Sequence, residues 1–504
     1  MTSSSHRSNK FIRDRAPALS AFLLFLATAA FLNIPTPELL NLSFGYEYGN
    51  IAEALVQGKG FSNAFTPASG STAWMPPLFV FMLAGIFSVF GIKTIASMWA
   101  IFVLKYAALA ACLPMLFSIV DRSEFRKYRY LIAVIFLGLI YLNLGTFFRS
   151  IHDEWLILFL ICSALGLLTA EAVHPSPSNK IRLYALAFIL PLANPILAVT
   201  FLIVALGLVM ARTQGPSPKK TAIILLAAFF ASTLLWTYRN YQAFGKIIPV
   251  KSNFWFDFYQ GNVMDDDGLT TNATFEVFHP IHTNAIQEQY LMEGESVFTD
   301  NYKHLAFEWI GSHPAQLLQN IGRRTVSAFL YMHQSDDILP ASHELLMTKD
   351  VEKLKQANLV SVNQPPFVNW TSLTVPEAEF RAKIEPLHLA DETAVVADWT
   401  SQRAALMIRF GELKLVVRSL VLSLVPFLCL IIGLSAERIR RNPAFLLSAA
   451  LYLIYLFPYI LVSHYRRYQV PLIVLQTVFI FPLACLLLER FAFWQKLFPA
   501  KTEH

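Results

Sequence analysis

Glu47 is a residue whose type and surroundings suit proton transfer. It lies between Tyr46 and Tyr48, directly before a short helical pattern at residues 50–57. Burial beside aromatic rings raises the pKa of a carboxyl group, which suits a general base or a general acid. A carboxylate at a helix start also complements the positive end of the helix dipole. Glu47 therefore has two interpretations, a catalytic one and a purely structural one.

A second acidic segment, His152-Asp153-Glu154, directly precedes a long apolar run. Acidic residues at a helix start often serve as N-terminal caps. Histidine and carboxylate side chains are also common metal ligands. The residues alone leave both interpretations open, helix capping and a functional acidic loop.

Arginines occur at two further positions that border apolar runs. Arg466 and Arg467 are adjacent in the loop 463–469, and Arg239 follows an apolar run that ends at residue 237. A guanidinium group binds phosphate oxygens in a bidentate manner, which suits a lipid phosphate or diphosphate. Arginine at a helix end also anchors the helix at the membrane surface. An anionic, lipid-carried substrate is the hypothesis that joins these arginines to the two acidic segments.

The composition indicates that membrane helices position these segments. Of the 504 residues, 55% are hydrophobic and only 15% are charged, whereas soluble domains carry roughly 25% charged residues. The mean hydropathy is +0.48. These values exclude a disordered or fibrous chain and predict an α-helical polytopic membrane protein. Because the basic residues lie in short loops between apolar runs, the net charge of +6 does not indicate nucleic-acid binding.

The apolar runs predict about ten membrane spans (10–13). A spanning helix needs about 20 mainly apolar residues, and basic loops mark the cytoplasmic side. Such loops occur at 121–129, 180–182, 212–220 and 437–441. Ten spans with both termini cytoplasmic satisfy this rule if 77–90 does not cross and if 183–211 is a hairpin that proline breaks near residue 194. The predicted spans are 17–34, 95–119, 130–148, 154–172, 183–194, 195–211, 221–237, 416–435, 444–462 and 470–488.

The long segment 238–412 differs from the rest of the chain in charge. It holds 22 of the 34 acidic residues but 13 of the 40 lysines and arginines, so its net charge is −9 while the remainder carries +15. It also lacks an apolar run of bilayer length. We therefore predict three parts: an N-terminal membrane module at 1–237 with an outer-face loop at 35–94, one mixed α/β periplasmic domain at 238–412, and a C-terminal membrane module at 413–504.

Four stretches, in this order, resemble one family of membrane enzymes. Residues 46–55, 58–61 and 70–78 resemble its first outer loop with a closing Pro-Pro helix, and 152–154 resemble its second acidic loop. Residues 239–262 resemble the entry to its soluble domain, and 465–471 resemble its late arginine element. The family is the GT-C type of membrane glycosyltransferase, in the bacterial branch similar to protein O-mannosyltransferases and the lipid A aminoarabinose transferase. Two departures are Glu47, where aspartate is usual, and the order Arg-Arg-Tyr-Gln at 466–469.

The resemblance implies a GT-C-like bundle and an inverting transferase that moves a sugar from a polyprenyl-phosphate donor. Glu47 would act as the general base, and Asp153 would orient the acceptor. Arg466, Arg467 and Arg239 would stabilise the donor phosphate. A divalent cation at Glu47 and Asp153 is an open alternative, since arginines alone can neutralise one phosphate. The implied substrate-binding residues are Tyr46, Tyr48, Asn50, Trp74, His152, Glu154, Asn240, His464 and Tyr465.

The resemblance further implies a monomeric, multi-pass protein of the bacterial inner membrane with its active site on the periplasmic side. Its partners would be the lipid-linked donor, membrane lipids and a lipid, glycan or protein acceptor. Two alternatives remain. An O-antigen polymerase or ligase would share the substrate type, and a transporter or flippase for a lipid-linked sugar would need charges within its spans. Lys105 is the main such charge in the sequence.

Overall fold

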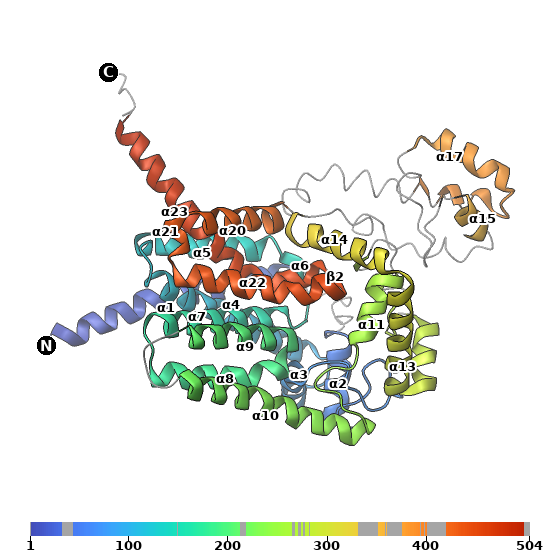
Figure 1. Ribbon diagram of the computed structural model, residues 1–504, viewed down its shortest axis with the longest axis horizontal. Helices are drawn as coiled ribbons and strands as arrows, with labels where there is room; N and C mark the ends of the chain where they lie inside the picture. The colour runs from blue at the N-terminus through green and yellow to red at the C-terminus, as the bar shows by residue number, and fades with distance from the viewer. Residues whose placement is uncertain are drawn as a thin grey trace. The chain divides into compact units, whose positions relative to one another are not determined.

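The chain is largely helical in the computed structural model (Figure 1). The structure describes residues 2–32, 44–148, 150–211, 218–264, 268–270, 274–275, 278–281, 283–330, 351–357, 359, 375–393, 395–397, 399–400 and 420–497; the side chain of Arg466 is not part of this description.

Among the residues that the structure describes, five helices are long and apolar enough to cross a membrane. They are α4 (Ile95–Val120), α7 (Glu154–Val173), α10 (Pro218–Phe244), α22 (Pro443–Val462) and the helical run Arg467–Phe491, which comprises most of η8 (Arg466–Leu472) and of α23 (Ile473–Leu497). The protein is thus an α-helical membrane protein, as its composition predicts.

The remaining predicted spans also coincide with helices, although these are shorter or less uniformly apolar. They are α1 (Thr2–Leu32), α5 (Arg129–Tyr141) with α6 (Leu144–Phe148), α8 (Pro177–Ala193), α9 (Pro195–Met210), and η7 (Leu420–Leu424) with α20 (Val425–Ser435). The break at residue 194 is confirmed, because the Asn194 side chain accepts a hydrogen bond from the Leu197 amide and caps α9. Residues 77–90 form α3 (Pro77–Phe90), a 14-residue helix shorter than a span. The count of ten spans remains a prediction.

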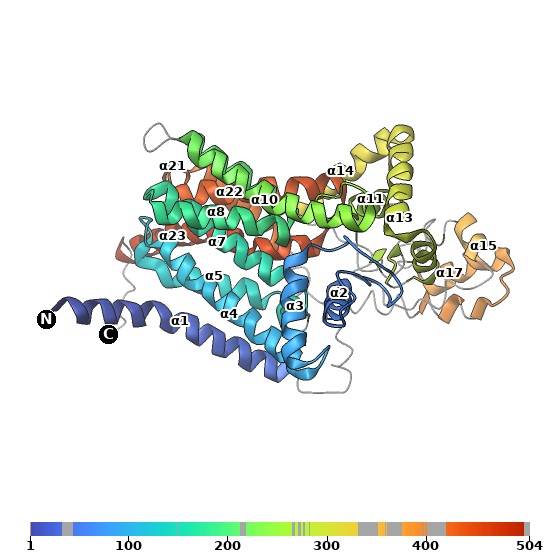
Figure 2. The same cartoon turned by 90° about the horizontal axis from the view of Figure 1, so that it is seen from below.

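The chain divides into two compact units. The first comprises residues 1–252, 425–458 and 467–504, and the second comprises 253–424 and 459–466. In the first unit, α4 packs against α1 and α7, α8 against α9 and α10, and α23 against α5 and α20. Figure 2 shows that α4, α7, α8 and α10 of this unit run along a similar direction, while α3 crosses them steeply and α2 (Glu47–Val56) lies beside α3.

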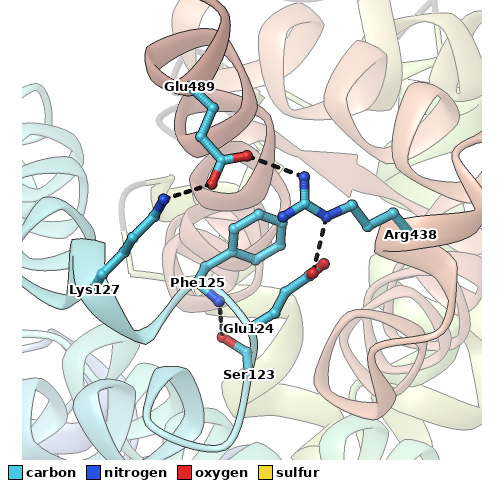
Figure 3. Close-up of polar contacts among 6 residues, drawn as sticks. All are labelled: Ser123, Glu124, Phe125, Lys127, Arg438 and Glu489. Atoms are coloured by element: carbon cyan, nitrogen blue, oxygen red, sulfur yellow. Dashed lines mark hydrogen bonds and ion pairs between the residues drawn. The ribbon is translucent and has the colours of Figure 1, made fainter. Parts of the chain in front are cut away.

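At one end of the first unit, a group of ion pairs links three segments of the chain (Figure 3). Arg438 of α21 (Glu437–Arg440) donates to Glu124 at 2.8 Å and to Glu489 at 3.0 Å. Lys127 of η2 (Arg126–Tyr128) lies 3.0 Å from the same Glu489. These contacts link the loop between α4 and α5 to α21 and to the C-terminal part of α23. They involve the basic loops that the sequence assigned to a single membrane side.

The second unit is also mainly helical in its described residues. It contains α11 (Phe254–Tyr259), η3 (Gln260–Met264), α13 (Asn284–Ser312), α14 (Pro314–Leu330), α15 (Val351–Gln356), α17 (Glu377–Ile384) and η6 (Glu385–Leu387). The strands β1 (Leu269–Thr270) and β2 (His464–Tyr465) pair in parallel, with Leu269 opposite His464. Each strand has only two residues, so the described part of this unit does not have the mixed α/β character that we expected.

The borders of the second unit differ from the sequence-based borders at 238 and 412. Helix α10 continues through residue 237 to Phe244, and residues up to 252 belong to the first unit. The Ser252 amide donates to the Ala73 carbonyl at 3.0 Å, which ties this connection to the first outer loop. Residues 459–466 join the second unit because β2 pairs with β1. Charge and hydropathy did not indicate this late return of the chain.

Candidate functional site

The first outer loop and the second acidic loop approach each other closely at Gly45. Phe44, Gly45 and Tyr46 have φ values of 45°, 80° and 52°, a left-handed run that is costly for the two aromatic residues. A Cβ atom at Gly45 would lie 2.9 Å from the Ile151 carbonyl oxygen, so a side chain does not fit there. This turn leads directly into Glu47 at the start of α2. The packing of 44–46 on residue 151 therefore brings the two acidic segments together.

Asp153 is held between a tyrosine and an arginine. The Tyr48 hydroxyl donates to Asp153 Oδ2 at 2.9 Å, and Arg467 Nη2 lies 3.8 Å from Asp153 Oδ1. Although Asp153 is the N-cap residue of α7, its side chain makes no capping hydrogen bond in the described residues. Burial, followed by the neighbouring Asp153 carboxylate, raises the pKa of Tyr48 well above its ordinary value. Tyr48 thus stays protonated and remains a hydrogen-bond donor to Asp153.

Glu154 is the second carboxylate that contacts Arg467. Its side chain is buried at the start of α7, and Arg467 Nε donates to Glu154 Oε1. Arg467 belongs to the 3-10 turn that precedes α23 and is separated from residue 154 by 313 positions. One arginine therefore contacts two adjacent carboxylates and offsets part of the repulsion between them, although one negative charge is left over when both acids are ionised. We refer to Tyr48, Asp153, Glu154 and Arg467 as the carboxylate–arginine cluster.

Glu47 and His152 border this cluster. The Glu47 side chain is buried, and its charge contributes to the raised pKa of Tyr48. The His152 ring stacks on Tyr46 with a centroid distance of 5.8 Å. Burial, then the positive charges of Arg467 and Lys105, lower the pKa of His152 well below its ordinary value. His152 is therefore neutral at pH 7 and contributes an aromatic, polar surface rather than a charge.

Lys105 fixes the acidic loop from the side of α4. Its side chain is fully buried, and its Nζ donates to the Ser150 carbonyl at 2.6 Å and to the Phe147 carbonyl at 3.1 Å. The ammonium group also lies 4.7 Å from the centre of the Phe102 ring, a cation–π contact. Lys105, the main charge that the sequence shows within a predicted span, thus donates its hydrogen bonds to backbone carbonyls of the loop that leads to Asp153.

Replacement of Lys105 by methionine is expected to loosen this loop. The carbonyls of Phe147 and Ser150 would lose their donor, at about 1–3 kcal/mol for each buried group. Hydrogen–deuterium exchange at residues 147–156 should therefore speed up relative to the wild type. Peptides from 123–128 at the Arg438 end of the unit are the internal control and should be unchanged. Unaltered exchange at 147–156 would show that other contacts hold the loop.

Two predicted ligands of the substrate, Arg239 and Asn240, donate hydrogen bonds to backbone carbonyls. Arg239 Nη1 donates to the Thr72 carbonyl and Nη2 to the Phe61 carbonyl, each at 2.6 Å. Asn240 is buried, and its Nδ2 donates to the Ile248 carbonyl at 2.9 Å. These contacts favour the structural interpretation of Arg239 as a helix-end anchor over a role in phosphate binding. The anchor holds residues 61–72 against the end of α10.

Asn50 and Trp74 are likewise engaged inside the first outer loop. Asn50 donates to the Ala64 carbonyl at 3.0 Å and accepts a hydrogen bond from Lys93 at 2.8 Å. Trp74 is fully buried and packs edge-on against Phe65 with a centroid distance of 5.0 Å. Both side chains stabilise the loop that carries Glu47. Direct substrate contact by either of them remains a prediction.

The other predicted residues from the late loop belong to the second unit. His464 is buried in β2, and Tyr465 packs against Phe275 with a centroid distance of 5.2 Å. Burial and then the nearby Arg324 lower the pKa of His464 to about 4. The side chain of Arg466 lies outside the described parts. Arg467, by contrast, is described and contacts the second acidic loop at Asp153 and Glu154.

The second unit is expected to lose stability in acid because of His464. The unfolded chain protonates this histidine below about pH 6.5, whereas the folded chain keeps it neutral down to about pH 4. Stability present above pH 6.5 should thus fall as the pH drops to 4, by up to about 1.4 kcal/mol per pH unit. Thermal unfolding in detergent should show a flatter pH profile for His464→Gln. The exposed His304→Gln is the matched control and should keep the wild-type slope.

Sequence reasoning missed Arg324, which is fully buried in the second unit. Its guanidinium donates to Asn262 Oδ1 at 2.9 Å and to the carbonyls of Gly261, Gly268 and Ile460 at 2.8–3.1 Å. Burial lowers its pKa to about 10, so it remains charged at pH 7. The available signal was the strongly amphipathic pattern of residues 314–330, whose inward side we did not identify. It was hidden because the polar residues of this helix face inward.

The carboxylate–arginine cluster does not fit a divalent cation in the geometry described. Asp153 accepts from Tyr48 and faces Arg467, and Glu154 accepts from the same arginine. No group of three or more metal-ligating side chains occurs among the described residues. The cluster is instead suited to hold acidic groups in fixed positions beside one guanidinium group.

Comparison of the chain with models of protein families, with characterised proteins and with solved structures finds no match.

Proposed function

We propose that the protein is an inverting glycosyltransferase that uses a polyprenyl-phosphate-linked sugar as donor. The observation that carries this proposal is the contact of Arg467 with Asp153 and Glu154, beside Tyr48 and Glu47. These residues come from three distant segments, and the resemblance to GT-C enzymes implies that the same three segments form one site. The contact also lies where membrane helices begin, a suitable place for a lipid-carried phosphate.

The proposed reaction is a single displacement at the sugar C1 atom. An acceptor oxygen forms a bond to C1 while the bond from C1 to the phosphate oxygen breaks. Glu47 takes the proton of the acceptor hydroxyl, and the polyprenyl phosphate leaves with the electron pair. Asp153, held by Tyr48, orients the acceptor. The configuration at C1 inverts because the acceptor attacks from the side opposite the phosphate.

Arg467 is the proposed ligand of the departing phosphate. A guanidinium group stabilises developing negative charge and binds phosphate in a bidentate manner. Its present contacts with Asp153 and Glu154 keep it at the site before the donor arrives. Arg239 is a weaker candidate, because its guanidinium holds the Thr72 and Phe61 carbonyls. We further propose that the site faces the periplasm of a bacterial inner membrane, with ten spans and both termini cytoplasmic.

A transfer assay with reconstituted protein tests this function. Purified wild-type protein in lipid vesicles would receive polyprenyl-phosphate donors with labelled sugars, together with lipid, glycan and peptide acceptors. The expected result is a glycosylated acceptor with inverted anomeric configuration, measured by nuclear magnetic resonance. A product with retained configuration would contradict the single displacement. Movement of the donor across the vesicle membrane without transfer would instead support the transporter alternative.

A further inference from the structure

Helix α14 exposes several large apolar residues, together with Gln319 and Thr325, and buries most of its hydrogen-bonding side chains on the opposite side. Asn320, Arg324 and Ser327, which are three or four positions apart, are buried. On the other side, Leu318 is 70% exposed, and Val326 and Leu330 are each at least 40% exposed. A surface helix of a soluble domain has the opposite arrangement, with apolar residues toward the core.

Hydrogen bonding explains why the polar side faces inward. Arg324 donates to several backbone carbonyls and to Asn262, and Asn320 Nδ2 lies 3.4 Å from the Asn262 carbonyl oxygen. Gly268 leaves room for this network, because a Cβ atom there would lie 2.5 Å from the Asn320 side chain. The hydrogen bonds of the buried polar residues thus orient the helix with its large apolar residues outward. These apolar residues are stable only if something other than water covers them.

The contacts of α14 place it at the end of a membrane helix. Arg324 donates to the carbonyls of Ile460 and Leu461, which lie in the last turn of α22. Helix α22 is long and apolar enough to span a membrane. Its exposed apolar residues Leu446, Leu453, Phe457 and Leu461 follow spacings of seven, four and four, which is one side of a helix. That side is suited to lipid, and it ends at the residue whose carbonyl binds Arg324.

Helix α14 has a second apolar neighbour. It packs against η7, which leads into the apolar helical stretch Val421–Ser435. An apolar side at the boundary of a bilayer is stable when it enters the region between headgroups and acyl chains. A soluble partner protein would have to bind beside the ends of two apolar helices, α22 and the stretch Val421–Ser435. A lipid bilayer meets this surface without any further component.

We propose that α14 lies in the membrane–water boundary, with the side formed by Leu318, Val326 and Leu330 in contact with lipid acyl chains. The second unit would then be attached to the bilayer by a surface of its own, in addition to its chain connections to the membrane helices. This inference is independent of the proposed transferase activity. It rests on the burial pattern of α14 and on its bonds to the end of α22.

Fluorescence quenching from within the bilayer tests this placement. A thiol-reactive fluorophore would be attached at Leu318→Cys or Val326→Cys in a Cys429→Ser background, since Cys429 is the half-buried native cysteine and the other three are buried. The protein would be placed in phosphatidylethanolamine–phosphatidylglycerol vesicles with nitroxide at carbon 5 of the acyl chain. That depth matches helices buried about 5–10 Å into the boundary. Lys303→Cys on α13, an exposed polar position, is the matched control.

The expected result is strong quenching by the lipid nitroxide at 318 and 326, and quenching by aqueous iodide at 303. Stronger iodide quenching at 318 and 326 than at 303 would overturn the proposal. Protection of 318 and 326 from both quenchers, with a dimer seen by light scattering, would also overturn it and would indicate that a second copy covers α14. Both labelled positions are exposed, so folding of the variants is checked by an unchanged elution profile.

Discussion

Glu47→Gln is expected to lower the transfer rate by about 10²–10⁴-fold, the usual contribution of a positioned general base. Glutamine keeps the size of the side chain but cannot accept the acceptor proton. The side chain is buried beside Tyr48, which already donates to Asp153. Donor binding should be retained, because the proposed phosphate ligand is Arg467. Single-turnover transfer and donor binding, measured on the same detergent-purified protein, separate the two effects.

The matched control for this change is Glu53→Gln on the same helix. Glu53 pairs with Lys93 at 3.0 Å and is about one-third exposed, so its loss should leave transfer near the wild-type rate. Equal rates for Glu47→Gln and wild type would reject Glu47 as the base and move that role to Asp153. Loss of transfer in both variants would point to damage of α2 rather than to lost base chemistry.

Arg324→Met is expected to cause the largest loss of stability. The guanidinium bonds of Arg324 satisfy Asn262 and carbonyls of Gly261, Gly268 and Ile460. Each buried acceptor that loses its donor costs about 1–3 kcal/mol, so the second unit should be strongly destabilised. The loss should exceed that of a typical substitution, which is roughly 0.5–3 kcal/mol.

Thermal unfolding in detergent and limited proteolysis measure this effect. Lys303→Met on the exposed side of α13 is the control, since it removes a positive charge that is not buried. Cleavage of Arg324→Met should begin within 253–330 at temperatures where the control is intact. A melting temperature equal to that of the control would mean that water replaces the guanidinium and that the network does not hold the unit.

The acidic segments and the late arginine were predictable because their chemistry is unusual for their positions. Asp153 and Arg467 stood out as charges beside long apolar runs, and Glu47 stood out as a carboxylate among aromatic residues. Their mutual contacts were not predictable from the sequence. They depend on the close approach of Gly45 to the Ile151 carbonyl and on the turn before α23. The sequence also did not decide between Arg466 and Arg467.

Several polar residues that we assigned to substrate binding also donate hydrogen bonds to backbone carbonyls. Arg239 and Asn50 bind backbone carbonyls that are distant in sequence from them, Thr72 and Ala64 respectively. A residue type alone does not distinguish a carbonyl partner from a ligand partner, because both accept from the same donors. Lys105 is a further case: it is the main charge within a predicted span, and its ammonium group donates to the carbonyls of Phe147 and Ser150.

Hydropathy predicted the positions of the membrane helices far better than it predicted the structure of the second unit. Apolar runs define helix position because unsatisfied backbone groups are excluded from lipid. The break before Pro195 and the short α3 followed from proline positions and length. In residues 253–330, by contrast, the burial of Arg324 inverted the usual relation between polarity and exposure, so a rule based on outward polar residues did not apply.

Two ion pairs of the first unit that join distant parts of the chain have a consequence for biogenesis. Glu154 meets Arg467 across 313 positions, and Glu124 meets Arg438 across 314. At about 5–20 residues per second, the ribosome needs roughly 15–60 s to make the second partner after the first. During this time Glu124 and Glu154 are already synthesised, but their arginine partners are not. The carboxylate–arginine cluster is therefore completed only when the start of α23 emerges, so a chain whose synthesis stops before residue 467 has the acidic groups without their cation.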